Sequence, residues 1–300
     1  MASGTVLRAS GGVYDVLLND GTVTEASLRG RLKLEQRTGD RIVAGDVVDL
    51  DDDLGIHTVH PRTSQLARRA PGHGRKAKVI VANAEQVVIV FSAASPEPKR
   101  RLLDRFLVLT EANELDALII VNKVELVDDD VVSSFLAPYE RVGYGTLRTS
   151  VVRGDGLDEM HRRLCGADSV VTGPSGVGKS SLLNTVQDGL GLRIGDVSEH
   201  VNKGQHTTVT ALIIPLECGG WVADTPGLRE LGLWGVERAE LAFCFPEIRD
   251  RSPDCRFSSC SHTHEPGCAV RAGVESGDVD SERYDSYRIL FDEAAEAPKY

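Results

Sequence analysis

The chain has no long hydrophobic run, and none of its segments approaches the roughly 18 apolar residues that a membrane-spanning helix needs. The longest apolar runs, Val87–Phe91 and Ala117–Val121, have the length of buried parallel strands. The first ten residues also lack the charged and apolar pattern of a secretory signal. We therefore expect a cytoplasmic protein that has no membrane partner.

An excess of positive charge is also missing, since the net charge of the chain is −11. This balance argues against bulk, non-specific binding to nucleic acid. Acidic residues, however, are absent between Leu54 and Ala84, a segment that carries six basic side chains: Arg62, Arg68, Arg69, Arg75, Lys76 and Lys78. The segment is either a solvated loop or a contact to a phosphate backbone.

A length of 300 residues, with 41% hydrophobic and 26% charged residues, is typical of a globular protein with two or three domains. The first 65 or so residues contain short alternating segments separated by turn signals, of which Asn19–Gly21 is a strong hairpin signal. About five short strands without a helix predict a small closed β-barrel of the oligonucleotide-binding (OB) type over residues 1–68. A barrel that serves only as a structural cap is the alternative.

From about residue 79 to 233 apolar runs alternate with helical periods. This pattern predicts an α/β domain with a mostly parallel, doubly wound sheet. The expected strands cover residues 87–91, 117–121, 146–149, 169–171, 211–214 and 221–224, and the expected helices lie near 99–113, 131–142 and 157–164.

A glycine-rich segment follows the apolar run that ends at Val171 and has the pattern GxxxxGK[ST]. Such a loop directs its backbone N–H groups at phosphate oxygens, and the next helix adds its N-terminal dipole. In this pattern Lys179 contacts the β- and γ-phosphates and Ser180 gives its hydroxyl to Mg²⁺. A simple glycine-rich turn is the alternative. The predicted phosphate-binding residues are Gly173, Pro174, Ser175, Gly176, Val177, Gly178, Lys179, Ser180 and Ser181.

A second segment, Asn122–Glu125, follows a buried strand at the place where an NKxD loop selects guanine in GTP-binding folds. The Asn side chain reads the O6/N7 edge of the base, while the carboxylate accepts from N1–H and the 2-amino group, which adenine lacks. Here the carboxylate is Glu125, one methylene longer than Asp, so guanine affinity is expected to be weaker. The predicted base-contacting residues are Asn122, Lys123, Val124, Glu125, Thr149 and Ser150.

Two further segments resemble the switches of GTP-binding folds. Asp224 ends a strand and is placed to hold Mg²⁺ through water, and Gly227 leaves room for a γ-phosphate. Gly204–Thr208 resembles a segment whose threonine completes the Mg²⁺ shell, and we favour Thr208 over Thr207. Any one such tetrapeptide is more often a plain turn. Because all of them lie at strand ends in one chain, we interpret them together as parts of a nucleotide site. The predicted magnesium ligands are Ser180, Thr208 and Asp224.

The order of these motifs is reversed relative to Ras-like proteins, because the base-reading loop precedes the phosphate loop. The chain is therefore expected to be a circular permutation of that fold. This order resembles the RsgA or YjeQ family of ribosome small-subunit-dependent GTPases. The resemblance covers nearly the whole chain and implies a barrel, a permuted GTPase domain over residues 79–233 and a mostly helical zinc-binding domain over residues 234–300.

The C-terminal segment contains C-x4-C-x-H-x5-C, formed by Cys255, Cys260, His262 and Cys268. Three thiolates and an imidazole suit one closed, tetrahedral, structural Zn²⁺ site. Three buried free thiols are the alternative, and His264 competes with His262 for the metal. A disulfide is not expected in a reducing cytoplasm. We expect the other cysteines, Cys165, Cys218 and Cys244, to be inert packing residues.

Leu228 stands where the water-orienting Gln of Ras would follow the Asp-x-x-Gly pattern, so intrinsic hydrolysis is expected to be slow. His206 is the candidate catalytic residue that orients or deprotonates the water, alongside Lys179; alternatively it only stabilises the switch or touches RNA. Both flanking domains join the GTPase domain next to the second switch. We therefore hypothesise that GTP changes the angles between the three domains.

The resemblance implies a monomeric GTPase that uses Mg²⁺ with GTP. Such an enzyme binds ribosomal RNA and proteins of the small ribosomal subunit during late maturation, and it leaves after hydrolysis. A GTP-dependent translation or stress regulator on the ribosome is one alternative. A non-catalytic RNA-binding adaptor, in which the nucleotide only stabilises the fold, is another.

Overall fold

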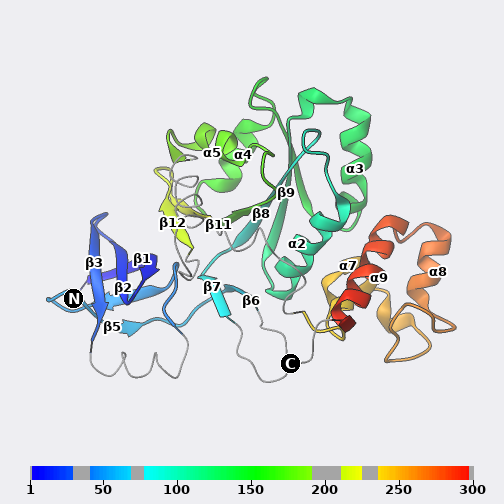
Figure 1. Ribbon diagram of the computed structural model, residues 1–300, viewed down its shortest axis with the longest axis horizontal. Coiled ribbons are helices and arrows are strands. Elements are labelled where there is room, and N and C mark those ends of the chain that lie inside the picture. Colours follow the sequence, from blue (N-terminus) through cyan, green and yellow to red (C-terminus); the bar gives the residue numbers. More distant parts are fainter. Residues whose placement is uncertain (1, 30–40, 69–77, 191–210, 225–235, 297–300) are drawn as a thin grey trace.

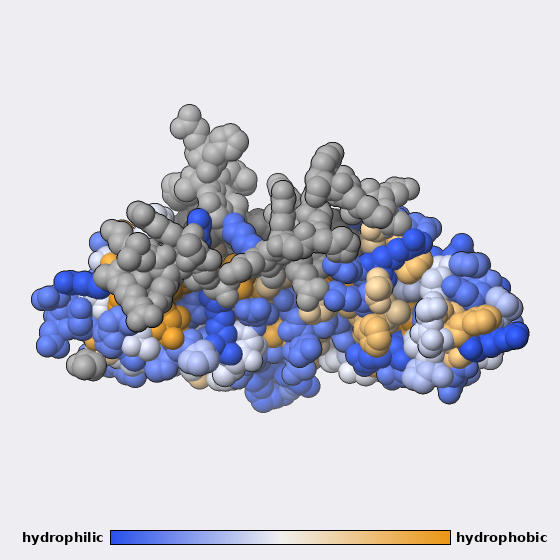
Figure 2. All heavy atoms as spheres, turned by 90° about the horizontal axis from the view of Figure 1, so that it is seen from below, coloured by the Kyte–Doolittle hydropathy of each residue, from blue (hydrophilic) through white to orange (hydrophobic). Residues whose placement is uncertain are grey.

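A computed structural model describes residues 2–29, 41–68, 78–190, 211–224 and 236–296. The chain forms a barrel, a central α/β part and a C-terminal helical part that lie in a row (Figure 1). Within the described ranges we find no helix with the length and hydrophobicity to span a bilayer. The face in Figure 2 is mainly hydrophilic where it is not grey, with hydrophobic residues in small separate areas.

The N-terminal part is a closed barrel with the strand order β1-β2-β3-β5-β4. Its strands are β1 (Ala2–Ser10), β2 (Val13–Leu18), β3 (Val23–Leu28), β4 (Val47–Leu50) and β5 (Gly55–Val59). Alternate side chains fill the interior, among them Val6, Val16, Val48 and Ile56. The predicted five-stranded barrel is confirmed.

Two further strands, β6 (Gln65–Arg68) and β7 (Lys78–Ala82), pair with one another between the barrel and the central sheet. The loop interpretation of residues 54–84 is therefore wrong where β5, β6 and β7 run. Leu66 and Val81 are fully buried, but the many basic residues of the segment obscured this apolar content.

The side chain of Arg62 in this segment has a structural role. Its Nε and Nη2 donate to the two carboxylate oxygens of Asp46 at 2.7 and 2.9 Å, and Asp46 is fully buried. A bidentate pair of this kind ties the end of the barrel to the chain that leaves it. Arg69, Arg75 and Lys76 lie outside the described residues.

The central part contains a six-stranded sheet with the order β10-β9-β8-β11-β13-β12, in which β12 alone of the six is antiparallel to its neighbour. Its strands are β8 (Gln86–Ser92), β9 (Asp116–Asn122), β10 (Gly145–Thr149), β11 (Ala167–Thr172), β12 (Leu212–Pro215) and β13 (Gly220–Asp224). The helices are α2 (Arg100–Ala112), α3 (Asp129–Arg141), α4 (Leu157–Leu164) and α5 (Lys179–Val186), with a 3-10 turn η1 (Val124–Leu126).

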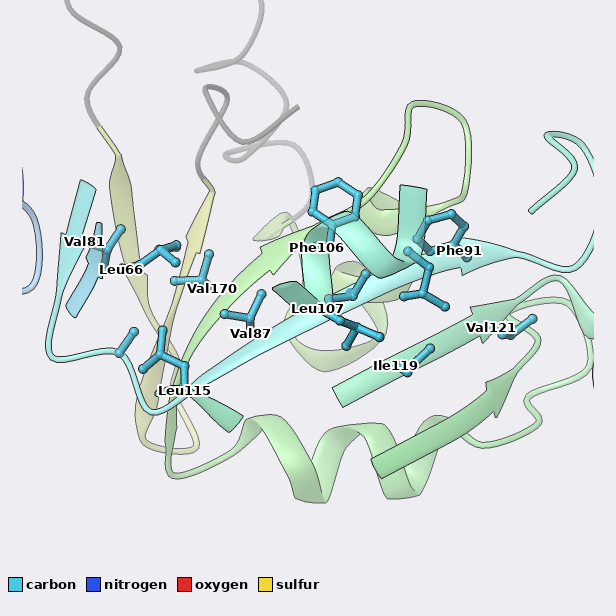
Figure 3. Packing of buried hydrophobic residues seen from close by; sticks show 14 of the residues in the cluster. Leu66, Val81, Val87, Phe91, Phe106, Leu107, Leu115, Ile119, Val121 and Val170 are labelled. Atoms are coloured by element: carbon cyan, nitrogen blue, oxygen red, sulfur yellow. The ribbon is translucent and has the colours of Figure 1, made fainter. Parts of the chain in front are cut away.

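Helices cover both faces of this sheet, as alternation along β8 shows. Val87, Ile89 and Phe91 pack in one core with side chains of α2 and α3. Val88 and Val90 pack in the other core with side chains of α4 and α5. Figure 3 shows Phe106 and Leu107 of α2 between Val87 and Phe91 in the first core. The predicted doubly wound sheet is confirmed, and its described elements start and end within about two residues of the expected bounds.

The C-terminal part consists of short helices around a small core. They are η3 (Leu241–Cys244), α7 (Pro246–Arg249), η4 (Ser252–Asp254), α8 (Ala269–Ser276) and α9 (Ser281–Glu296). Tyr284, Tyr287, Leu290 and Phe291 of α9 are buried in that core, so this apolar stripe of the helix serves packing.

A buried ion triad joins this part to the central sheet domain. Arg283 of α9 donates to Asp104 of α2 at 2.6 Å, and to both carboxylate oxygens of Glu247 at 2.7 and 2.9 Å. Burial alone would lower the pKa of Arg283, but the two carboxylates outweigh this effect and raise it. The sequence did not predict the triad. Charged residues are almost never fully buried unless they are paired, and the sequence does not show which residues form the pair.

The expectation for two of the cysteines is wrong, because Cys165 and Cys218 are joined by a disulfide. Cys165 lies two residues before β11, and Cys218 lies in the turn before β13. The parallel pairing of β11 with β13 therefore brings together residues that are 53 positions apart. Cys244 is buried as expected, and burial raises the pKa of its thiol to about 12.

Candidate nucleotide-binding and metal sites

The glycine-rich loop connects the end of β11 to the start of α5, as its sequence pattern requires. Gly173 has a φ of +138°, and a Cβ at this position would lie 2.0 Å from the carbonyl oxygen of Val90 in β8. Only glycine fits so close to a neighbouring strand at this backbone angle. The tight turn therefore depends on residue type, and it places the loop at the carboxyl ends of the parallel strands, where α/β folds bind ligands.

The base-reading loop lies against this phosphate loop. The side-chain Nδ2 of Asn122 donates to the carbonyl oxygen of Val177 at 2.9 Å. Gly178 has a φ of +95°, and a Cβ there would lie 2.4 Å from the same Asn122 nitrogen. The two motifs that are 55 residues apart in the chain thus converge on one edge of the sheet.

Asn122 is held in a single orientation from both sides. It is 2% exposed, and its Oδ1 accepts a hydrogen bond of 3.1 Å from the hydroxyl of Thr149 at the end of β10. Ser150, which is also buried, accepts from the backbone N–H of Arg153 and donates its own N–H to Asp155. The predicted pair Thr149 and Ser150 therefore supports the base-reading loop and shapes the turn behind it.

Two lysine side chains donate hydrogen bonds to backbone carbonyl oxygens of the phosphate loop. Lys123 is in the left-handed region at φ +61°, and its Nζ donates to the carbonyl oxygens of Ser95 at 2.7 Å and Gly176 at 2.6 Å. Lys179 donates to the carbonyl oxygens of Gly173 at 2.7 Å and Pro174 at 2.6 Å. Lys123 thus ties the base-reading loop to the phosphate loop, and Lys179 holds its charge over the loop itself.

Glu125, in η1, has a buried carboxylate oxygen, Oε2, without a hydrogen-bond partner among the described residues. An unpaired buried acceptor is costly unless a donor arrives from outside. The N1–H and 2-amino group of guanine are donors of this kind. Val124 is buried in the core and also borders a cleft lined by Asp129, Val132, Arg148, Arg153 and Asp155.

The predicted magnesium ligands are only partly within the described residues. Ser180 and Ser181 are exposed in the first turn of α5, and Asp224 is the last residue of β13. His206, Thr208, Gly227 and Leu228 lie outside the described residues. Because β13 pairs in parallel with β11, the backbone of Asp224 lies beside Val171, next to the start of the phosphate loop.

The C-terminal part brings three thiols and one imidazole together. The sulfurs of Cys255, Cys260 and Cys268 and a ring nitrogen of His262 all lie within 4.8 Å of one another. His262 Nδ1 lies 3.5 Å from the sulfur of Cys255 and 3.6 Å from that of Cys268. The predicted Cys₃His metal-binding site is present, and His264 is exposed and not part of it.

A neighbouring serine fixes the orientation of the His262 ring and the position of its proton. The hydroxyl of Ser252 donates to the carbonyl oxygen of Ile248 at 2.7 Å, so its oxygen accepts from His262 Nε2 at 3.1 Å. This arrangement places the ring proton on Nε2 and leaves the Nδ1 lone pair for a metal. Burial also lowers the pKa of His262, which keeps the imidazole neutral. The sequence pattern gave no signal for Ser252.

Glu265 fixes the loop that carries these ligands. It accepts from the backbone N–H of Ser261 at 2.9 Å and from that of His264 at 3.3 Å. Burial acts to raise the pKa of Glu265, but these hydrogen bonds outweigh it and hold the pKa well below its usual range. Tyr284 and Tyr287 of α9 donate to the carbonyl oxygens of His262 and Ser261. The helix therefore supports the metal loop directly.

Comparison with known proteins agrees with this geometry. The RsgA GTPase family matches residues 59–234. Proteins named small ribosomal subunit biogenesis GTPase RsgA are similar over nearly their full lengths. The one from Gemmatimonas aurantiaca is 48% identical over 297 residues, which cover 97% of each chain. The one from Moorella thermoacetica is 42% identical over 288 residues, which cover 95% of this chain and 94% of the relative.

Two solved structures share the whole architecture. YjeQ from Thermotoga maritima superimposes with a TM-score of 0.79 at 32% identity and covers 99% of both chains. YloQ, described as a circularly permuted GTPase, gives a TM-score of 0.74 at 30% identity, covering 100% of this chain and 97% of that one. The predicted permutation is thereby confirmed. The chain belongs to the RsgA family of GTPases, enzymes that hydrolyse GTP.

Proposed function

We propose that this chain hydrolyses GTP while bound to the small ribosomal subunit, acts late in the maturation of that subunit, and leaves it after hydrolysis. The names of its relatives describe small ribosomal subunit biogenesis. The observation that supports the catalytic part most directly is the contact of Asn122 with Val177, since it forms one nucleotide site from two separate motifs.

Guanine is selected by the residues of the base-reading loop in this proposal. The carboxylate of Glu125 accepts from N1–H and the 2-amino group, which leaves its buried oxygen satisfied only when guanine is bound. Asn122, already fixed by Thr149, contributes to the recognition of the base and keeps the phosphate loop at a set distance from it. Lys123, Val124 and Ser150 shape the same pocket.

The phosphates lie in the loop Gly173–Ser181 in this proposal, where backbone N–H groups and the charge of Lys179 neutralise them. Lys179 then exchanges its two loop carbonyls for phosphate oxygens. Ser180, Thr208 and Asp224 hold Mg²⁺, which when bound neutralises charge on the β- and γ-phosphates. The exposed hydroxyl of Ser180 in the first turn of α5 is consistent with that role, and Gly227 leaves space for the γ-phosphate.

Hydrolysis is slow on the isolated chain in this proposal, because Leu228 cannot position a water molecule by hydrogen bonding. His206 orients or deprotonates the attacking water when the chain is bound to the ribosome. The small subunit therefore acts both as target and as activator.

A structural Zn²⁺ is held by Cys255, Cys260, His262 and Cys268 in this proposal. Three thiolates and a neutral imidazole are the donor set of closed zinc sites, and the ring proton of His262 already points away from the sulfurs. Burial raises the pKa of the Cys260 thiol to about 12, and a bound cation would favour its thiolate form. The metal stabilises the loop that α9 supports.

The partner surfaces follow from the three-part architecture. We propose a barrel domain at 1–68, a GTPase domain at 79–233 and a zinc domain at 234–300. The barrel, the basic 62–78 segment other than Arg62, and the zinc domain contact ribosomal RNA and proteins. The enzyme is a cytoplasmic monomer in this proposal.

The decisive experiment measures GTP hydrolysis with and without purified small ribosomal subunits. Strong stimulation is expected, and depletion of the protein should leave immature small subunits. Stimulation without an assembly defect would favour the translation regulator, and no turnover in either condition would leave the RNA-binding adaptor. The double variant Lys179→Ala with Ser180→Ala should lose nucleotide binding and keep its metal, whereas Arg162→Ala, at an exposed position near the end of α4, should retain both.

A further inference from the structure

A cluster outside the nucleotide and metal sites joins two strands of the central sheet. The disulfide Cys165–Cys218 connects the residue after α4 to the turn of the β12–β13 hairpin. His161, one helical turn earlier, has both ring nitrogens 3.4 Å from the sulfur of Cys165. Cys218 and His161 are exposed and Cys165 is half-buried, so small solutes reach the cluster from water.

The backbone holds the two cysteines face to face independently of their bond. The N–H of Gly166 donates to the carbonyl oxygen of Gly219 at 2.8 Å, and Ala167 pairs with Gly220 in the ladder of β11 with β13. The Cα atoms of the cysteines are 5.3 Å apart, within the range that a disulfide requires. The bond can therefore open and close without rearrangement of the sheet.

We propose that Cys165 and Cys218 form a reversible thiol pair that hydroperoxides oxidise, with His161 as the proton acceptor for Cys165. Disulfides of cytosolic proteins are usually transient or redox-sensing. A thiol in contact with an imidazole is the member of such a pair that reacts first, since its thiolate is the nucleophile. Cys165 therefore attacks, and the exposed Cys218 resolves.

The reaction balances as two steps. Cys165 first passes its proton to His161. The resulting thiolate attacks one oxygen of the peroxide. The O–O bond breaks, and the leaving hydroxide or alkoxide takes the proton from His161 to form water or an alcohol. Cys165 is now a sulfenic acid. The Cys218 sulfur attacks it, the S–O bond breaks, and hydroxide leaves with the thiol proton as a water molecule. The two sulfurs have given two electrons to the peroxide.

The position of the bond gives the oxidation a structural effect. β11 leads into the phosphate loop and β13 ends at Asp224, so the bond fixes the starting ends of both strands to each other. It also closes a loop between residues 53 positions apart, and this loop contains the whole phosphate loop. The oxidised chain is expected to show slower hydrogen exchange in the β12–β13 hairpin than the reduced chain.

The test uses full-length, metal-loaded protein that is first reduced and then treated with hydrogen peroxide. Two of the six thiols should be lost, and peptide mass spectrometry should find Cys165 linked to Cys218. Cys218→Ser should trap a sulfenic acid on Cys165, while Cys165→Ser should leave Cys218 unreactive. His161→Gln should slow disulfide formation by roughly three- to tenfold, whereas Arg162→Gln on the same helix should have no such effect.

Three results would overturn the proposal. Links that involve the cysteines of the Cys₃His cluster in preference to this pair would show that the pair has no special reactivity. An unchanged rate in His161→Gln would remove the proton acceptor. Uptake of a second Zn²⁺ by the reduced chain, together with resistance to peroxide, would show that the three side chains serve as a metal site, for which their ligand atoms lie close enough.

Discussion

Replacement of Arg283 by Met is expected to loosen the C-terminal part from helix α2. The guanidinium is 1% exposed and bridges Asp104, which is fully buried, and Glu247, which is 6% exposed. Met fills a similar volume but leaves two carboxylates buried without their cation. Breaking a buried pair by removal of one partner costs about 3–5 kcal/mol. That cost corresponds to a roughly hundredfold to several thousandfold change in an opening equilibrium.

The measurement is amide hydrogen exchange in α9, because the three-part chain is not expected to unfold in a single two-state transition. Protection of α9 should fall by that factor, while protection in the barrel should stay unchanged. Arg288→Met, at an exposed position of the same helix, is the matched control and should change little. The triple variant Arg283→Met, Asp104→Leu, Glu247→Leu should regain most of the protection, since it leaves no buried charge. A fall of less than about tenfold in Arg283→Met would refute the reasoning.

Further predictions concern the metal loop, the base and the pH. Cys268→Ser should lose bound zinc by elemental analysis and expose α9 to exchange, but an intact metal content would contradict the assigned ligands. Glu125→Asp should keep or improve GTP affinity, and Glu125→Ala should lose discrimination against ATP; a variant that still rejects ATP would assign base selection to another residue. Burial, together with the charge of Glu85, raises the pKa of Asp168 from 3.8 to about 6. The folded state thus holds this proton more tightly than the unfolded chain, and stability falls as pH rises from about 4 to 6. Asp168→Asn should therefore melt at a higher temperature than the parent at pH 7, with no difference near pH 4, and equal melting at both pH values would exclude a destabilising charge on Asp168.

Features that depend on neighbouring residues were predictable from the sequence. The barrel strands alternate with period 2, the phosphate loop has a fixed pattern of glycines, and the four metal ligands lie within 14 residues, from Cys255 to Cys268. For the strands and the loop, the local backbone geometry depends on residue type at a short spacing, and the structure follows it closely.

Features that depend on distant residues were not predictable. Arg283 meets Asp104 across 179 positions, and neither residue shows a pattern that names the other. Cys165 and Cys218 meet only because β13 pairs with β11, a register that the sequence does not specify. Ser252 supports His262 from a separate short helix. In each case tertiary packing determines which residue is the partner, and single-residue propensities carry no information about that packing.

The permutation changes the order in which the chain reaches the nucleotide site but leaves the sheet unaltered. The site is built at the carboxyl ends of the adjacent strands β9, β8 and β11, and β8 lies between the two motifs. The chain enters the sheet at β8 from the barrel, and α2 follows β8 directly. Leu7 and Ala44 of the barrel side share a core with Val87 of β8.

The C-terminal part in turn is attached to α2 through Asp104. Both flanking parts therefore contact the unit β8–α2. The carbonyl oxygen of Ser95, between β8 and α2, accepts a hydrogen bond from Lys123 of the base-reading loop. The hypothesis that GTP changes the angles between the parts thus becomes more specific. A nucleotide-dependent shift of β8–α2 would move the barrel and the metal domain together, while a shift of the strands β11 and β13 alone would leave the C-terminal attachment unchanged.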